Sequence, residues 1–139
     1  MNSINWLAVL VAAISAFVIG GIWYSRPVFG NAWMKDSNLT EDEIKKSNKG
    51  KIFGFTLFFS LLMAVNLAMF LKDPVGVDCG PKTNLSWGMT AGFLAGIWTF
   101  CAVAIHSLFE LKPWRLILIN GFYTVVALVI MGAIIGAWR

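Results

Sequence analysis

Hydrophobic residues gather in four long windows of the chain that hold no charged side chain. These windows cover residues 1–25, 52–71, 83–109 and 116–138, and a charged residue follows each of them. Crossing a hydrocarbon core of about 30 Å takes roughly 20 apolar residues in an α-helix. Lipid offers the backbone no hydrogen-bond partners, and the alternation of polarity typical of a membrane β-barrel is missing. The pattern therefore predicts four transmembrane helices.

The longest polar stretch lies between the first two windows. Within it, Thr40 can cap the start of a helix, three acidic residues follow, and Lys45 and Lys46 suit a last turn. Residues 27–34 are apolar but too few to span a membrane, so we expect them at the membrane interface. We predict an all-α, polytopic membrane protein, a four-transmembrane-helix bundle with a short interfacial or cytoplasmic helix between helices 1 and 2.

The predicted organisation is a single transmembrane domain over residues 1–139. We do not expect the first window to be a secretory signal, because it lacks a basic start and its apolar run is too long. The four helices are expected at approximately residues 4–25, 52–71, 85–109 and 114–138.

Composition supports a membrane location. The chain of 139 residues is 58% hydrophobic and 13% charged, against about 45–50% and 25% in soluble domains. A net charge of +4 needs no nucleic acid to explain it, because basic residues beside membrane segments attract anionic headgroups. We therefore expect membrane lipids as partners and no nucleic acid.

Lysine and arginine are distributed unevenly between the two sides of the predicted bundle. Eight of the 11 fall in the loops after the first and third windows. In short loops such residues tend to stay on the cytoplasmic side. We predict a multi-pass protein of the inner (cytoplasmic) membrane with both termini outside. Tryptophans near the window ends fit an interfacial belt: Trp6, Trp23, Trp87, Trp114 and Trp138.

Small residues recur every four positions in three of the predicted helices. On the third helix, the small face continues towards His106 and Glu110, while bulky side chains cover the opposite side. This spacing lets helix backbones approach closely, either inside one bundle or across a homo-oligomer seam, and both readings stay open. The expected packing positions are Gly88, Gly92, Gly96, Ala12, Ala16, Gly20, Gly132 and Gly136.

Polar residues within a membrane span are costly, so they indicate either a structural network or a functional site. His106 and Glu110 are one turn apart near the cytoplasmic end of the third helix, and polar or aromatic residues lie at similar depth in the first and fourth helices. We predict a small polar cleft there, either a satisfied structural network or a ligand, proton or ion site. Its candidate residues are His106, Glu110, Asn120, Tyr123, Tyr24 and Trp23.

The available side chains argue against a metal centre or a catalytic set. One histidine with one carboxylate is too few for a metal cage, and CxxC and HExxH motifs are missing. Ser107 has no evident base and acid partners. We therefore expect no metal, no cofactor and no catalytic residue. Cys79 and Cys101 differ by some 15 Å in expected depth, so we predict no disulfide between them.

Several motifs are spread over nearly the whole chain: Gly20-Gly21-Ile22-Trp23-Tyr24-Ser25, Gly30, Trp33-Met34, His106-Ser107-Leu108-Phe109-Glu110, Pro113-Trp114 and Asn120-Gly121-Phe122-Tyr123. Together they resemble the DUF1761 family of small bacterial and fungal membrane proteins. That family has no established activity, so the resemblance implies a fold and a set of signature positions without a reaction. The central loop and Cys79 match nothing in the family pattern.

Three functions are compatible with this pattern. The first is a non-enzymatic bundle, with a homo-oligomer as one form, whose polar cleft binds or passes a small solute, ion or proton. The alternative is a structural or accessory subunit that binds another membrane protein. An enzyme acting on a lipid or quinone, with His106 and Glu110 as acid and base, is least favoured because the sequence supplies no nucleophile or metal set.

Overall fold

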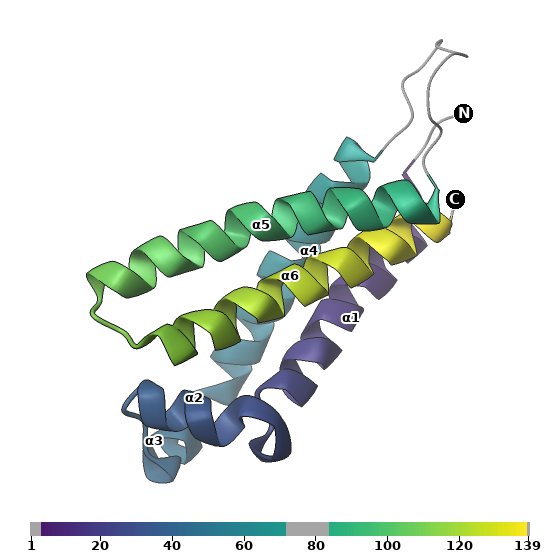
Figure 1. Ribbon diagram of the computed structural model, residues 1–139. Coiled ribbons are helices and arrows are strands. Elements are labelled where there is room, and N and C mark those ends of the chain that lie inside the picture. The colour runs from purple at the N-terminus through teal and green to yellow at the C-terminus, as the bar shows by residue number, and fades with distance from the viewer. Residues whose placement is uncertain (1–3, 72–83, 139) are drawn as a thin grey trace.

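The computed structural model describes residues 4–71 and 84–138, and this part of the chain consists of helices joined by short turns, with no strand (Figure 1). Its long helices are α1 (Trp6–Trp23), α4 (Lys49–Phe70), α5 (Leu85–Phe109) and α6 (Trp114–Ala137). Each of these four is long and apolar enough to cross a membrane. The predicted all-α fold with four transmembrane helices is confirmed.

Asparagine caps set where three of the long helices begin. The side-chain oxygens of Asn5, Asn48 and Asn84 accept hydrogen bonds from backbone N–H groups three residues later, at 3.2, 3.1 and 2.9 Å. The cap at Asn48 lets α4 begin at Lys49, three residues before its charge-free window. Lysines tolerate such a position because their long side chains can reach the membrane surface.

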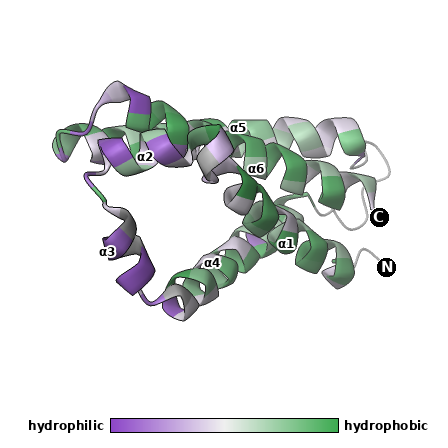
Figure 2. Cartoon of the chain, turned by 90° about the horizontal axis from the view of Figure 1, so that it is seen from below, coloured by the Kyte–Doolittle hydropathy of each residue, from purple (hydrophilic) through white to green (hydrophobic). Residues whose placement is uncertain are grey.

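Three short helical segments connect α1 to α4. They are the π-helical turn η1 (Arg26–Gly30), α2 (Asn31–Asp36) and α3 (Glu41–Lys46). Thr40 caps α3 as expected, because its Oγ1 accepts a hydrogen bond from the backbone N–H of Glu43 at 3.2 Å. Figure 2 shows these segments at one end of the molecule, with hydrophilic residues concentrated in α2 and α3.

The long helices form a row in which each packs mainly against the next, in the order α4, α1, α6, α5. The C-terminal end of α4 lies near the start of α5, where the rings of Phe70 and Trp87 are 6.3 Å apart. Towards its N-terminal end, α4 leaves α5 and α6 (Figure 2). Where α1 begins and α6 ends, the Asn5 side chain donates a hydrogen bond to the Trp138 carbonyl at 3.1 Å. Both ends of the described chain therefore lie on the same side of the molecule.

Close packing depends on the small residues that the sequence singles out. A Cβ atom at Gly88 would collide with the Gly132 backbone, and one at Gly92 with the Leu128 backbone. A Cβ atom on Gly96 would lie 2.9 Å from the Val125 Cα, and one on Gly136 would lie 3.0 Å from the Gly88 Cα, so a glycine seam joins α5 to α6 within one chain. Ala12 and Ala16 of α1 are buried in the core between α4 and α6, and Gly20 faces the ring of Tyr123.

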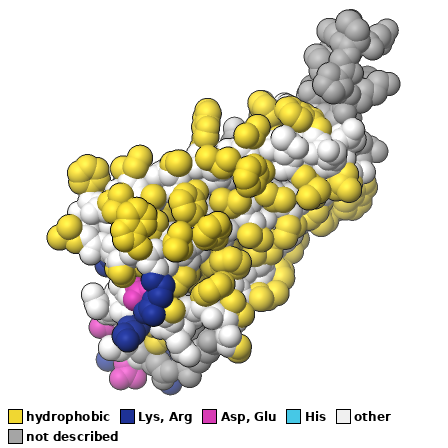
Figure 3. Space-filling view, in the orientation of Figure 1, with side chains coloured by type: hydrophobic (Ala, Val, Ile, Leu, Met, Phe, Trp, Pro, Cys, Tyr) yellow, Lys and Arg dark blue, Asp and Glu magenta, His cyan; other side chains and the backbone are white. Residues whose placement is uncertain are grey.

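The outer surface is apolar over the length of the helices. Hydrophobic side chains cover the visible face, and charged side chains gather at one end (Figure 3). No more than 39% of the residues in any of the four spans are buried inside the protein. Such a surface suits a lipid environment, because exposing so much apolar area to water would be unfavourable.

Candidate functional site

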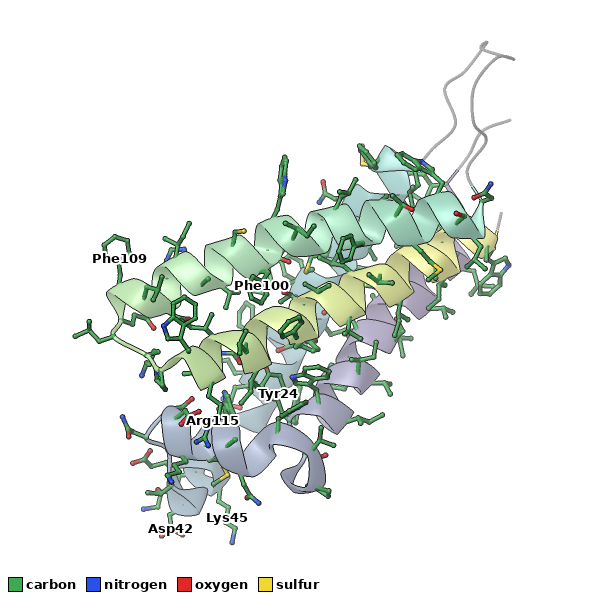
Figure 4. The ribbon with its side chains drawn as sticks, viewed as in Figure 1. Tyr24, Asp42, Lys45, Phe100, Phe109 and Arg115 are labelled. Carbon is green, nitrogen blue, oxygen red and sulfur yellow. The ribbon has the colours of Figure 1, made fainter. Side chains whose placement is uncertain are left out.

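Four of the six residues of the predicted polar cleft lie together where α1, η1, α2 and α6 meet. They form the centre of a cluster that we call the aromatic corner, together with residues of the turn and of α2. Figure 4 shows Tyr24 and Arg115 between α6 and the α1–α2 segment. The corner consists of Trp23, Tyr24, Gly30, Trp33, Asp36, Arg115, Asn120 and Tyr123.

Three side-chain hydrogen bonds attach the end of α1 to α6. The Trp23 indole N–H donates to the Ile119 carbonyl at 2.9 Å, and the Tyr24 hydroxyl donates to Asn120 Oδ1 at 2.7 Å. The Tyr123 hydroxyl donates in the other direction, to the Ala16 carbonyl, at 2.9 Å. The rings of Tyr24 and Tyr123 meet edge to face at 5.5 Å. Each polar tip of these aromatic residues is therefore paired within the chain.

A glycine makes the turn that follows α1 possible. The Gly30 N–H donates to the Ser25 carbonyl at 2.8 Å, closing a turn wider than that of an α-helix. A Cβ atom on Gly30 would lie 2.5 Å from the Tyr24 carbonyl oxygen, closer than real Cβ atoms approach. The turn brings α2 back towards α6, and the rings of Trp33 and Tyr24 meet at 5.6 Å.

An ion pair joins the end of α2 to the start of α6. The Arg115 guanidinium donates from Nε and Nη2 to the two carboxylate oxygens of Asp36, both at 2.6 Å. The Asp36 side chain is 10% exposed, whereas that of Arg115 is 52% exposed. The hydrogen bonds from Arg115, with smaller contributions from the charges of Arg115 and Lys35, hold the pKa of the Asp36 carboxyl below its usual value.

His106 and Glu110 do not join the corner. Both side chains are exposed, and within the described residues neither is hydrogen-bonded to the other cleft candidates. Near this end of α5 the buried polar side chain is that of Ser107, which is 7% exposed. The expectation that the small face of α5 continues to His106 needs this correction.

The reason lies in the geometry of the glycine seam. Four residues advance about 400° around a helix, so a seam that repeats every four positions shifts by about 40° at each step. Relative to Gly88, the contact side has moved by about 80° at Gly96. Ser107 lies at about 100° and His106 back at about 0°. His106 therefore lies about 80° away from the contact side reached at Gly96, whereas Ser107 lies within about 20° of that side and is buried.

The corner is built to hold helices together. In the described part of the chain, no buried side-chain nitrogen or oxygen lacks a hydrogen-bond partner. Nor does that part contain a group of three histidine, cysteine or carboxylate side chains able to hold a metal ion. Cys79 lies outside the described residues, so the expected absence of a disulfide stays a prediction; Cys101 is a free, exposed thiol.

A tryptophan at mid-span is the feature that sequence reasoning missed. Trp98 lies 13 residues after the first residue of α5 and 11 before its last, and it is 81% exposed. Within the described residues its indole N–H has no hydrogen-bond partner. The sequence could have revealed it, because Trp98 lies far from both ends of its charge-free window. The other tryptophans of the membrane spans lie near window ends, where the membrane interface favours them.

The fold and the surface together define a multi-pass membrane protein with four spans. The chain belongs to the DUF1761 family, described as proteins of unknown function, whose family model matches residues 7–136. No curated protein and no solved structure matches the chain. Five of the residues on which the sequence resemblance to this family rests lie in the aromatic corner: Trp23, Tyr24, Gly30, Trp33 and Asn120.

Proposed function

We propose that this protein is a non-enzymatic accessory subunit that binds a transmembrane helix of another membrane protein through the outer face of α5. Trp98 is the observation that carries this proposal. An indole N–H about 20 Å from one end of the helix and about 16 Å from the other has neither water nor headgroups within reach. A partner helix with a hydrogen-bond acceptor at this depth would satisfy it.

The energetics of tryptophan support this assignment. A donor without an acceptor in an apolar medium costs about 1–3 kcal/mol, and phenylalanine would fill the same lipid-facing position without that cost. Tryptophan is also prominent among the residues that dominate binding energy at protein interfaces. The neighbouring side chains on the same face are apolar and exposed: Leu94, Cys101, Ile105 and Phe109.

Passage of a solute or proton through the polar cleft receives less support. A path across the corner would need polar groups that are free to bind the passing species. Trp23, Tyr24 and Tyr123 instead donate their hydrogens to Ile119, Asn120 and Ala16 of the same chain. These bonds favour a fixed structural role for the cleft residues.

The native thiol Cys101, one turn from Trp98, allows a direct test of the α5 face. In a Cys79→Ser background, a thiol-reactive photo-crosslinker on Cys101 is activated in native membranes, and the adducts are identified by mass. We expect one adduct with a different membrane protein. Trp98→Phe should reduce its yield at least about fivefold, because a loss of roughly 1 kcal/mol of binding energy corresponds to that factor.

Trp114→Phe is the matched control. Trp114 is also exposed but lies at the first residue of α6, where headgroups and water can accept its hydrogen bond, so the adduct should persist. An adduct whose mass is twice that of this chain would indicate a second copy and contradict the proposal. An adduct that is equally abundant in Trp98→Phe would contradict it as well.

A further inference from the structure

Three lysines lie close together in the sequence around the start of α4. Lys45 and Lys46 end α3, and Lys51 lies in the first turn of α4. All three side chains are exposed, and none pairs with a carboxylate within the described part of the chain. Asp42 and Glu43, on the same short helix as Lys45 and Lys46, are exposed acidic residues. Figure 4 shows Lys45 at the lower end of the molecule, pointing away from the long helices.

An exposed aromatic stripe continues directly from Lys51 along α4. Phe55, Phe58 and Phe59 follow Lys51 at helical spacing, and each is more than half exposed. The rings of Phe55 and Phe59 stack at 6.3 Å, and those of Phe58 and Phe59 meet edge to face at 5.6 Å. The stripe ends at Leu62, 44% exposed.

The opposite side of α4 is occupied by the protein itself. Ser60, Ala64 and Leu67 are buried, and the ring centroids of Phe53 and Phe17 of α1 are 5.6 Å apart. The aromatic stripe therefore faces away from α1 and the core. Its length also matters, because the helix rises about 16 Å over the 11 steps from Lys51 to Leu62, close to the thickness of one leaflet's hydrocarbon layer of about 15 Å.

We infer that this face of α4 binds an anionic phospholipid, with the headgroup phosphate at Lys45, Lys46 and Lys51 and an acyl chain along Phe55, Phe58 and Phe59. Ammonium groups donate charge-assisted hydrogen bonds to phosphate oxygens, and basic clusters beside a membrane helix attract anionic lipids. The aromatic stripe supplies an apolar surface one leaflet deep below them. The inference is independent of the proposed function, which concerns α5.

Native mass spectrometry of the purified protein in detergent tests the site with two lipids. Phosphatidylglycerol and phosphatidylcholine with the same long acyl chains are titrated, and the bound fractions give apparent dissociation constants. We expect tighter binding of phosphatidylglycerol. Lys51→Gln should weaken that binding about fivefold, since each lysine near an anionic surface contributes about that factor. The triple variant Lys45→Gln, Lys46→Gln, Lys51→Gln should bind the two lipids equally.

Lys112→Gln is the charge-matched control, because Lys112 precedes α6 and is not part of the lysine group at α4. Its effect should be less than about twofold, because it lies outside the proposed headgroup contact. A loss equal to that of Lys51→Gln would mean diffuse attraction by net charge and would overturn the site. Circular dichroism of each variant checks that the helices are retained, and the single substitution keeps the test valid if the triple variant unfolds.

Acyl-chain length tests the aromatic half of the site. Short-chain phosphatidylglycerol, which cannot reach along the stripe, should bind at least tenfold more weakly than the long-chain lipid. Equal binding of the two would overturn the role of the phenylalanines. If this face instead binds a partner helix, the purified protein should show no preference between phosphatidylglycerol and phosphatidylcholine. That result would overturn the proposal.

Discussion

At the scale of single residues, the polar tips of the aromatic corner determine how α1 meets α6. Tyr123 is the central example, because its hydroxyl donates to the Ala16 carbonyl while its ring lies against Gly20. Tyrosine and tryptophan suit such a position, since they combine a large apolar ring with one hydrogen-bonding group. The absence of a side chain at Gly20 is what allows this ring to approach α1.

Two adjacent glycines offer a matched test of that contact. A Cβ atom on Gly20 would lie 3.0 Å from the Tyr123 hydroxyl, whereas one on Gly21 would meet nothing within 4 Å. We expect Gly20→Ala to lower the free energy of unfolding by about 1 kcal/mol, because Tyr123 must move and its bond to Ala16 lengthens. Gly21→Ala should be neutral or stabilising by up to about 1 kcal/mol, because alanine is the better helix former.

Unfolding in mixed micelles, followed by circular dichroism, measures both variants. The sign of the difference between them is the informative quantity, because the two substitutions add the same methyl group to the same helix. Equal stabilities for the two variants would mean that the Tyr123 contact with α1 contributes little.

At the scale of elements, the helices themselves were predictable and their rotations were not. Charge-free windows place the four spans because hydrocarbon excludes charge over a fixed thickness. The start of α4 lies three residues before its charge-free window, because Asn48 caps a helix that includes Lys49 and Lys51. The π-helical turn at Gly30 has no periodic signature in the sequence. Near the end of α5, the buried polar residue is Ser107, and His106 is exposed.

The attachment of α2 to α6 has a defined pH dependence. The Asp36 pKa is lowered from its ordinary value near 3.9, so the unfolded state binds more protons than the native state in that range. The contribution of the ion pair with Arg115 is therefore complete above a pH of about 5 and is lost as the pH falls through the lowered native pKa.

Hydrogen exchange of the α2 amides, corrected for intrinsic rates, should report this loss. We expect constant protection of α2 from neutral pH down to about pH 5 and declining protection below it. Asp36→Asn should remove the dependence and give low protection throughout. Asp42→Asn, which alters an exposed carboxylate of α3, should behave as the native protein does. A pH-dependent loss that persists in Asp36→Asn would assign the effect to another group.

At the scale of the whole molecule, the order of helix packing decides which surfaces remain free. Window positions carry no information about neighbours, so the row of α4, α1, α6 and α5 could not be read from them. Four of the six cleft candidates do meet, because helical periodicity and depth bring Trp23, Tyr24, Asn120 and Tyr123 to one end of adjacent helices. His106 lies in α5, the last helix of the row, and Glu110 follows directly after that helix, so both stay outside the corner.

This arrangement leaves the outer face of α5 uncovered around Trp98, and the proposal of an accessory subunit depends on what covers it in the membrane. The most direct measurement is the mass of the particle released from native membranes into nanodiscs, determined by native mass spectrometry. We expect the particle to contain this 15.3 kDa chain together with a different membrane protein. Trp98→Phe should release the chain alone. A native particle of 15.3 kDa, or of a whole-number multiple of it, would contradict the proposed function.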